Sequence, residues 1–216
     1  MNPLQTKLTT VGLEALAPYG FVLAGGYALR AHGYGTRESD DIDLFTNILD
    51  PDNFTRAVEA LVAAYEAGGL TVEVARRAPQ FARLVVDSAA KVDLGVDHRQ
   101  RPPVLTEVGA VLSEADSIGS KVGAVYSRLE PRDFMDVQAV LDSGRHHPDA
   151  LLALADQREA LPLDRPMFAA QLRAGARLPD AGFTRYGAGP DLIARIRRTA
   201  TEWALELDRG SDAPAL

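Results

Sequence analysis

Two stretches of the sequence decide the fold: Gly25-Gly26-Tyr27 and, after a short gap, Arg37-Glu38-Ser39-Asp40-Asp41-Ile42-Asp43-Leu44-Phe45. The second stretch is typical of a short strand in which carboxylates alternate with apolar residues. Alternation places Asp41 and Asp43 on one face of that strand and the apolar residues on the other. Two carboxylates on one face repel each other, and a hard cation such as Mg²⁺ relieves that repulsion. The pattern therefore predicts a metal site.

The composition narrows the class of protein. The chain has 216 residues and no cysteine, which excludes disulfides, cysteine-based zinc sites and thiol catalysis. No apolar run is long enough to span a bilayer, and residues 1–10 lack the apolar segment of a signal peptide. We therefore expect a cytoplasmic protein that makes no membrane contact.

The charge balance bears on nucleic-acid binding. A formal net charge of −7 counts against a basic surface all over the molecule, although a local strip remains compatible with it. The strongest local candidate is the cluster Arg195, Arg197 and Arg198 within a helix predicted at 191–207. These arginines are either an RNA contact or an ordinary solvated face.

Periodicity and turn residues predict two regions of different character. Over residues 1–101 the expected order is strand, helix, strand, helix and three strands, at 21–24, 27–32, 41–46, 54–67, 71–76, 81–86 and 91–96. Such an order indicates an α/β (α+β) mixed sheet with helices on it. Residues 102–216 are expected to be mostly helical and to close the cleft of the first region, with helices at 117–126, 131–141, 148–155, 166–174 and 191–207.

A third carboxylate lies on a later strand of the predicted sheet. The segment 91–96 alternates, with Asp93 on the polar face and Asp97 following the strand. Residues 87–90 suit a hairpin connection to the preceding strand. Asp93 is the preferred third ligand, and Asp97 is the alternative.

These features together resemble the nucleotidyltransferase superfamily that includes DNA polymerase β. The Gly25-Gly26 turn, the pair Asp41 and Asp43, and the distant Asp93 follow its loose pattern. More narrowly, the run from Arg37 to Asp43 looks like the AbiEii/MenT-type toxins, the nucleotidyltransferase-like halves of bacterial toxin–antitoxin pairs. Further along, Lys121 and the segment Arg132-Asp133-Phe134-Met135-Asp136 are similar to that family's lysine-then-RD helix. Two departures are Tyr27, where a small hydroxyl residue is common, and Gly26, where serine is frequent.

The resemblance implies a role for each site residue. Asp41, Asp43 and Asp93 would hold two Mg²⁺ ions that neutralise the attacking and leaving oxygens of an in-line displacement. Asp93 would also orient or deprotonate the acceptor hydroxyl. Gly25 and Gly26 would bring backbone N–H groups to the triphosphate of an NTP, and the helix after them would add its positive end.

Other residues of the pattern carry open alternatives. Lys121 would be a point charge on the triphosphate, and Arg37 a phosphate contact or a structural ion pair. Asp133 and Asp136 share a helix face and either reach the metals or pair with basic neighbours. Ser39 lies beside the acids, so a phosphate group there would compete for the cations. Equal activity of a Ser39→Glu variant and the wild type would count against such regulation.

The function implied is that of a toxin. It would transfer nucleotides from an NTP to an RNA 3′ end, most plausibly of tRNA, block translation, and have a cognate antitoxin as protein partner. One alternative is a small-molecule nucleotidyltransferase of the aminoglycoside-modifying kind, which the negative charge suits. The other is a non-catalytic binding protein with the same fold, against which the intact carboxylate set argues.

Overall fold

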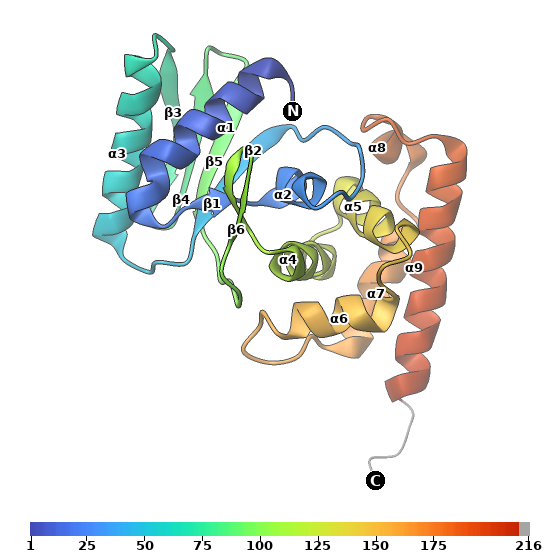
Figure 1. Cartoon of the computed structure of the whole chain (residues 1–216). Coiled ribbons are helices and arrows are strands. Elements are labelled where there is room, and N and C mark those ends of the chain that lie inside the picture. The colour runs from blue at the N-terminus through green and yellow to red at the C-terminus, as the bar shows by residue number, and fades with distance from the viewer. Residues whose placement is uncertain (212–216) are drawn as a thin grey trace. The chain divides into compact units, whose positions relative to one another are not determined.

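The computed structural model of the protein describes residues 1–211 and contains two compact units (Figure 1). The first unit comprises Met1–Gly33 and Glu38–Ser117, and the second comprises Tyr34–Arg37 and the residues from Ile118 onward. The boundary expected after residue 101 lies inside the first unit, and the division comes instead after Ser117. Residues 212–216 of the expected helical half lie outside the described residues.

A mixed sheet forms the centre of the first unit. Its strands are β1 (Val22–Leu23), β2 (Asp41–Thr46), β3 (Val72–Ala78), β4 (Phe81–Val86), β5 (Ala90–Val96), β6 (Val104–Thr106) and β7 (Gly109–Val111). The sheet has seven strands in the order β3-β4-β5-β2-β1-β7-β6. β2 pairs in parallel with β5, and β1 with β7, whereas the other neighbours are antiparallel. This sheet confirms the expected mixed α/β core.

Helices cover the apolar face of that sheet. The first unit contains α1 (Pro3–Leu16), the short 3-10 helix η1 (Ala17–Tyr19), α2 (Gly25–Ala31) and α3 (Pro51–Ala67). A Cβ atom added at Gly12 of α1 would lie 3.0 Å from Leu44 and 2.9 Å from the Tyr65 hydroxyl of α3, so both helices meet at β2. Ile42 and Leu44 are fully buried there. Burial of one such side chain stabilises the folded state by about 1.5–3 kcal/mol.

The alternation read from the sequence is therefore correct for β2, but two features of the first unit differ from expectation. Gly25 and Gly26 were expected as a turn and are instead the first residues of α2. β6 and β7 lie in the region expected to be helical. Each of these strands has three residues, which is too short for a period of two to show.

A buried carboxylate fixes the loop that leads to these short strands. Asp116, at the start of α4 (Glu114–Ser127), accepts hydrogen bonds from the backbone N–H groups of Gln100 and Arg101, each at 2.9 Å. The Ser113 hydroxyl donates to Asp116 at 2.7 Å and accepts from its backbone N–H at 3.1 Å. Such a serine caps a helix N-terminus. α4 begins in the first unit and continues into the second.

The second unit is helical. After α4 its elements are α5 (Pro131–Asp142), α6 (Pro148–Asp156), α7 (Arg165–Gly175), α8 (Asp180–Thr184) and α9 (Pro190–Ser211). Proline occupies the first turn of α5, α6 and α7, where its missing N–H costs no hydrogen bond. Phe168 of α7 and Trp203 of α9 pack edge to face with ring centroids 5.0 Å apart. Across residues 1–211, none of the helices combines the length and apolarity needed to cross a membrane.

Candidate active site

Three carboxylates meet on the polar face of the first unit's sheet. Asp41 and Asp43 lie on β2, and the parallel pairing of β2 with β5 places Asp43 opposite Asp93. One oxygen from each of the three carboxylates lies within 4.8 Å of the others. Within the described residues this group contains Asp93, the preferred candidate, and Asp97 is not part of it.

The backbone of β2 explains why these side chains share a face. Ile42 and Leu44 point into the core, so the alternate residues Asp41 and Asp43 point the other way. A shift of one residue in the register would move the apolar side chains out of the core and the carboxylates into it. The core therefore fixes the position of the acidic group.

Gly25 lies directly against the acidic group. Its φ is +61°, in the left-handed region, and a Cβ atom there would be 1.8 Å from Oδ2 of Asp43. The neighbouring Ala24 N–H donates to the Asp43 carbonyl at 2.8 Å. Gly25 is thus required for the close approach of α2 to Asp43, whatever further contact its backbone makes with a ligand. Gly26 follows it as a buried residue of the same helix.

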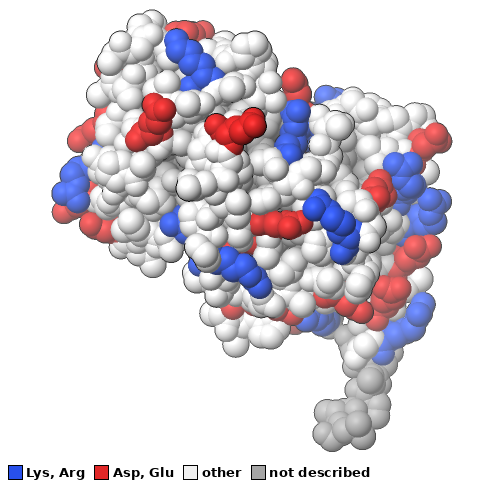
Figure 2. All heavy atoms as spheres, in the orientation of Figure 1, with Lys and Arg blue, Asp and Glu red and all other residues white. Residues whose placement is uncertain are grey.

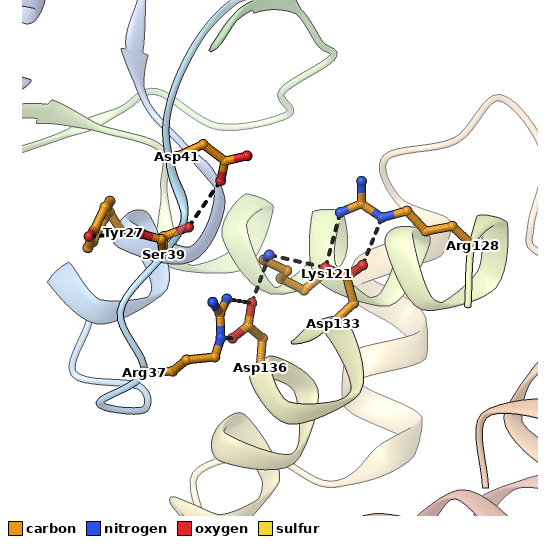
Figure 3. Close-up of polar contacts among 8 residues, drawn as sticks. All are labelled: Tyr27, Arg37, Ser39, Asp41, Lys121, Arg128, Asp133 and Asp136. Carbon is orange, nitrogen blue, oxygen red and sulfur yellow. Dashed lines mark hydrogen bonds and ion pairs between the residues drawn. The ribbon is translucent and has the colours of Figure 1, made fainter. Parts of the chain in front are cut away.

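Ser39 and Tyr27 support the start of β2 (Figure 3). The buried Ser39 hydroxyl donates to Oδ1 of Asp41 at 3.2 Å. The Ser39 carbonyl accepts from the side-chain amide of Gln5 and lies within hydrogen-bond distance of the Tyr27 hydroxyl, both at 3.2 Å. The same hydroxyl is 2.6 Å from Oε1 of Gln5, and burial raises the pKa of Tyr27. Tyr27, which departs from the expected pattern, thus supports the start of β2. Gln5, which no sequence motif singles out, does so as well.

Arg83 of β4 is a further site residue that no sequence pattern singles out, and its guanidinium pairs with the acidic group. Its Nε lies 2.7 Å from Oδ1 of Asp93 and its Nη2 lies 2.5 Å from Oδ2. Nη2 is also 3.7 Å from Asp41. The hydrogen bonds that Arg83 donates to Asp93 raise the pKa of Arg83 above its ordinary value. The connection expected at 87–90 would have paired Leu84 with Asp93. In the structure Ala90 already pairs with Val86, and this shift of one residue places Arg83 opposite Asp93.

The residues present fit a hard divalent cation. All three donors are carboxylates, which are the ligands that Mg²⁺ prefers. They converge from two adjacent strands, and a positive group, the Arg83 guanidinium, already lies against two of them. Asp41, Asp43 and Asp93 would hold the ion.

A second polar group lies in the second unit (Figure 3). The Lys121 amine is 3.3 Å from Asp133 and 2.8 Å from Asp136. Arg37 adds a fork to Asp136, with Nε at 3.1 Å and Nη2 at 2.9 Å, and Nε of Arg128 lies 2.7 Å from Asp133. All the carboxylates here are buried. Asp133 and Asp136 therefore pair with basic neighbours, which is one of the two roles expected for them.

The electrostatics of Asp136 follow from its partners. Burial alone would raise its pKa, but the positive charge of Lys121 and the hydrogen bonds from Arg37 outweigh burial and hold the pKa below its ordinary value. Asp136 is therefore an anion that stabilises two cations of its own unit. The role expected for Lys121 and Arg37 toward a nucleotide stays a prediction.

The arginines of α9 do not form a uniform basic strip. Arg195 lies 3.3 Å from Asp142, and Arg197 lies 2.5 Å from Asp180. Arg198 is exposed on the same helix. Acidic and basic side chains are interspersed on the face drawn in Figure 2. These ion pairs lower the local positive charge, and the expected RNA contact stays a prediction.

Comparison with known proteins gives one family. A sequence model described as "Nucleotidyl transferase AbiEii toxin, Type IV TA system" matches residues 13–202. No curated protein matches the sequence. The match spans both units and includes every candidate site residue.

Solved structures support the fold. MenT4, a nucleotidyltransferase toxin from Mycobacterium tuberculosis H37Rv, is similar at 19% sequence identity with a TM-score of 0.61, over 98% of this chain and 84% of that one. JHP933 from Helicobacter pylori is similar at 16% identity with a TM-score of 0.52, over 95% of this chain and 92% of that one. At such identities the likeness concerns the fold, which is the expected nucleotidyltransferase-like α/β fold.

Gly25→Ala tests the packing of α2 on Asp43. The new Cβ atom would push the carboxylate aside, so we expect Mn²⁺, used as a probe for the site, to bind about tenfold more weakly or worse. Isothermal titration calorimetry measures this. Gly69→Ala is the matched control, because Gly69 also has a positive φ of +77° but no neighbour within 4 Å of an added Cβ. Gly69→Ala should lower the stability of the protein but leave its affinity for Mn²⁺ unchanged. Wild-type Mn²⁺ affinity in Gly25→Ala would contradict the argument.

Asp136→Asn tests the buried network. Removing the buried negative charge that Lys121 and Arg37 share, while Asp133 still pairs with Lys121, should lower the free energy of unfolding by about 3–5 kcal/mol. Urea denaturation measures this. Asp180→Asn, which breaks an exposed pair with Arg197, should cost about 0–1 kcal/mol.

Asp136→Asn also tests how the stability of the protein depends on pH. Because the folded pKa of Asp136 is lowered, its stabilisation is complete above the unfolded value of about 4 and is lost as the pH falls through the folded pKa. The stability of the wild type should therefore decline on acidification below pH about 4 more steeply than that of Asp136→Asn. Parallel pH profiles would show that Asp136 is not the depressed carboxylate.

Proposed function

The chain belongs to the nucleotidyl transferase AbiEii toxin family, and we propose that it transfers a nucleotide from an NTP to the 3′ hydroxyl of an RNA, with tRNA as the acceptor. One observation carries the catalytic part of this proposal: Asp41, Asp43 and Asp93 converge within 4.8 Å on one face of the sheet. A set of three carboxylates from adjacent strands is suited to metal-assisted transfer at phosphorus. The consequence for the cell would be tRNA that can no longer be aminoacylated.

The proposed reaction is an in-line displacement. The oxygen of the acceptor hydroxyl forms a bond to the α-phosphorus while the bond from that phosphorus to the leaving oxygen breaks. Pyrophosphate departs with the bonding electrons, and the hydroxyl proton passes to a base. Mg²⁺, when bound, would supply charge neutralisation for the attacking and leaving oxygens. Such transfers depend on positioning and charge more than on a covalent intermediate.

The residues of the first unit divide this work. Asp41 and Asp43 hold the cation in a position fixed by β2, and Asp93 completes the set and orients the acceptor hydroxyl. Ser39 donates to Asp41 and so fixes the direction of that carboxylate. The first N–H groups of α2, at Gly25 and Gly26, have no intrahelical acceptor and are suited to phosphate oxygens. Lys121 and Arg37 are proposed triphosphate contacts on the sequence resemblance alone.

The proposed partners are an RNA and an antitoxin. The family description names a toxin–antitoxin system, which supports a cognate antitoxin as protein partner. The RNA acceptor rests on the resemblance to the toxins. A formal net charge of −7 favours one competing acceptor, a small cationic molecule such as an aminoglycoside.

One experiment tests the transfer. The protein is incubated with each radiolabelled NTP, Mg²⁺ and total RNA, and the products are resolved on a denaturing gel. We expect label in the tRNA band and a loss of about a thousandfold or more in Asp41→Ala, because a ligand of the reacting centre is removed. Asp97→Ala is the matched control, since Asp97 follows the same strand as Asp93 but lies outside the carboxylate group. It should label tRNA as the wild type does.

Each other outcome excludes part of the proposal. Label in an added aminoglycoside but in no RNA would assign the alternative acceptor. Label in neither would favour a non-catalytic binding protein. The same assay on a variant with Arg195, Arg197 and Arg198 changed to Glu tests the helix α9, and unchanged labelling with an unchanged salt dependence would remove that helix from the RNA surface.

A further inference from the structure

We propose that Arg83 is the built-in counter-cation of the carboxylate group: it neutralises Asp93 and Asp41 while no metal is bound, leaves them when a divalent cation binds, and then contacts a phosphate of the bound nucleotide. This inference rests on the proposed metal-dependent transfer and assigns a further binding residue to the same site. It makes the metal and the nucleotide depend on each other for binding.

The contacts of Arg83 show how the acidic group is held together. Its fork uses both oxygens of Asp93, at 2.7 and 2.5 Å, and the same guanidinium lies 3.7 Å from Oδ2 of Asp41. Asp93 and Asp41 are buried, at 5% and 7% exposure. Buried carboxylates this close to each other require a positive charge near them. Arg83 supplies that charge from β4, the neighbouring strand.

A divalent cation and this fork compete for the same oxygens. A two-pronged guanidinium occupies the favoured lone pairs of both oxygens of Asp93, and a dication bound at that carboxylate would lie close to the guanidinium and repel it. Arg83 therefore opposes the entry of a free metal ion. Its departure is the condition for full use of Asp93 as a ligand.

The Arg83 side chain has room to move away from Asp93. Its side chain is 37% exposed, so the guanidinium leaves Asp93 without crossing the core. Cross-strand pairing places Arg76, Arg83, Asp93 and Asp43 in one row over β3, β4, β5 and β2. The ring of Phe81 lies beside this row, 6.0 Å from the Arg83 guanidinium and 5.3 Å from that of Arg76. Displaced along this row, Arg83 stays on the face of the sheet that carries the site.

The chemistry of the displaced group selects its next partner. A guanidinium fork matches phosphate oxygens as well as it matches a carboxylate. The phosphates of a metal-bound NTP would lie at the carboxylate group, one strand away from Arg83. The nucleotide then replaces the partner that the metal removes, so each ligand strengthens the binding of the other. The site would accept a metal–nucleotide complex and resist the free ion.

The test measures metal affinity with and without a nucleotide. Mn²⁺ is titrated into wild type, Arg83→Gln and Arg76→Gln, followed by electron paramagnetic resonance, first alone and then with a non-hydrolysable NTP analogue. We expect Arg83→Gln to bind Mn²⁺ alone about tenfold more tightly and to lose most of the gain in affinity that the analogue gives the wild type. Arg76→Gln, the next arginine of the same row, should match the wild type in both titrations.

Further variants guard against an effect on folding. Arg83→Lys keeps the charge but loses the fork, and should give intermediate values in both titrations. Thermal unfolding without metal should show a lower Tm for Arg83→Gln, because the carboxylates lose their counter-cation, and Mn²⁺ should raise its Tm more than that of the wild type. Unchanged or weaker Mn²⁺ binding by Arg83→Gln, or an unchanged gain from the analogue, would overturn the inference.

The outcomes separate this inference from the proposed function. If Mn²⁺ binds to wild type and Asp41→Asn equally, the metal site itself is absent and both proposals fall. If the titrations follow the expectation but no nucleotide reaches any acceptor, only the proposed function fails. If transfer occurs and Arg83→Gln titrates as the wild type does, only the role of Arg83 is wrong.

Discussion

Repulsion among three carboxylates is the constraint on which this structure depends. Nothing in Asp41, Asp43 and Asp93 draws them together, so the backbone beneath them has to hold them in place. The parallel pairing of β2 and β5 does so, because it places Asp43 opposite Asp93 while the alternate residues fill the core. The energy that fixes the site is thus hydrophobic and lies on the opposite face of the sheet. The register between β2 and β5 therefore determines both the packing of the core and the positions of the three carboxylates.

Much of the fold and of the carboxylate group could be predicted, because strand alternation and helix starts depend on residues that are close together in the sequence. The alternation of β2 fixes which face its carboxylates occupy. The alternation of β5 puts Asp93 and Asp97 on the same face, and the end of the strand at Val96 separates them. The helices α3, α5, α6 and α7 begin, as expected, near a proline, which the structure places in the first turn of each. The Gly25-Gly26 pair indicates a close approach of the backbone, and the neighbour that the structure shows is the Asp43 side chain.

The rest depends on pairing between distant parts of the chain. Arg83 reads as an ordinary polar residue of a strand until the hairpin register places it on Asp93. Asp116 reads as a helix-start acid, and its second task, holding the backbone at Gln100 and Arg101, is invisible without coordinates. The sequence offers no sign that Lys121 pairs with two buried carboxylates of its own unit, and its contact with a nucleotide stays a prediction. β6 and β7 are strands only because a partner strand is present.

The segment Tyr34–Arg37 has a consequence for how this protein can be divided. It lies between α2 and β2 in the sequence, yet it belongs to the second unit, where Arg37 pairs with Asp136 and the Tyr34 hydroxyl lies 3.0 Å from His146. Neither unit is therefore a continuous stretch of chain. A gene fragment ending at Ser117 would encode the carboxylates complete but would leave these four residues without the helices they pack on. A cut after Ser117 therefore separates this segment from the unit to which it belongs.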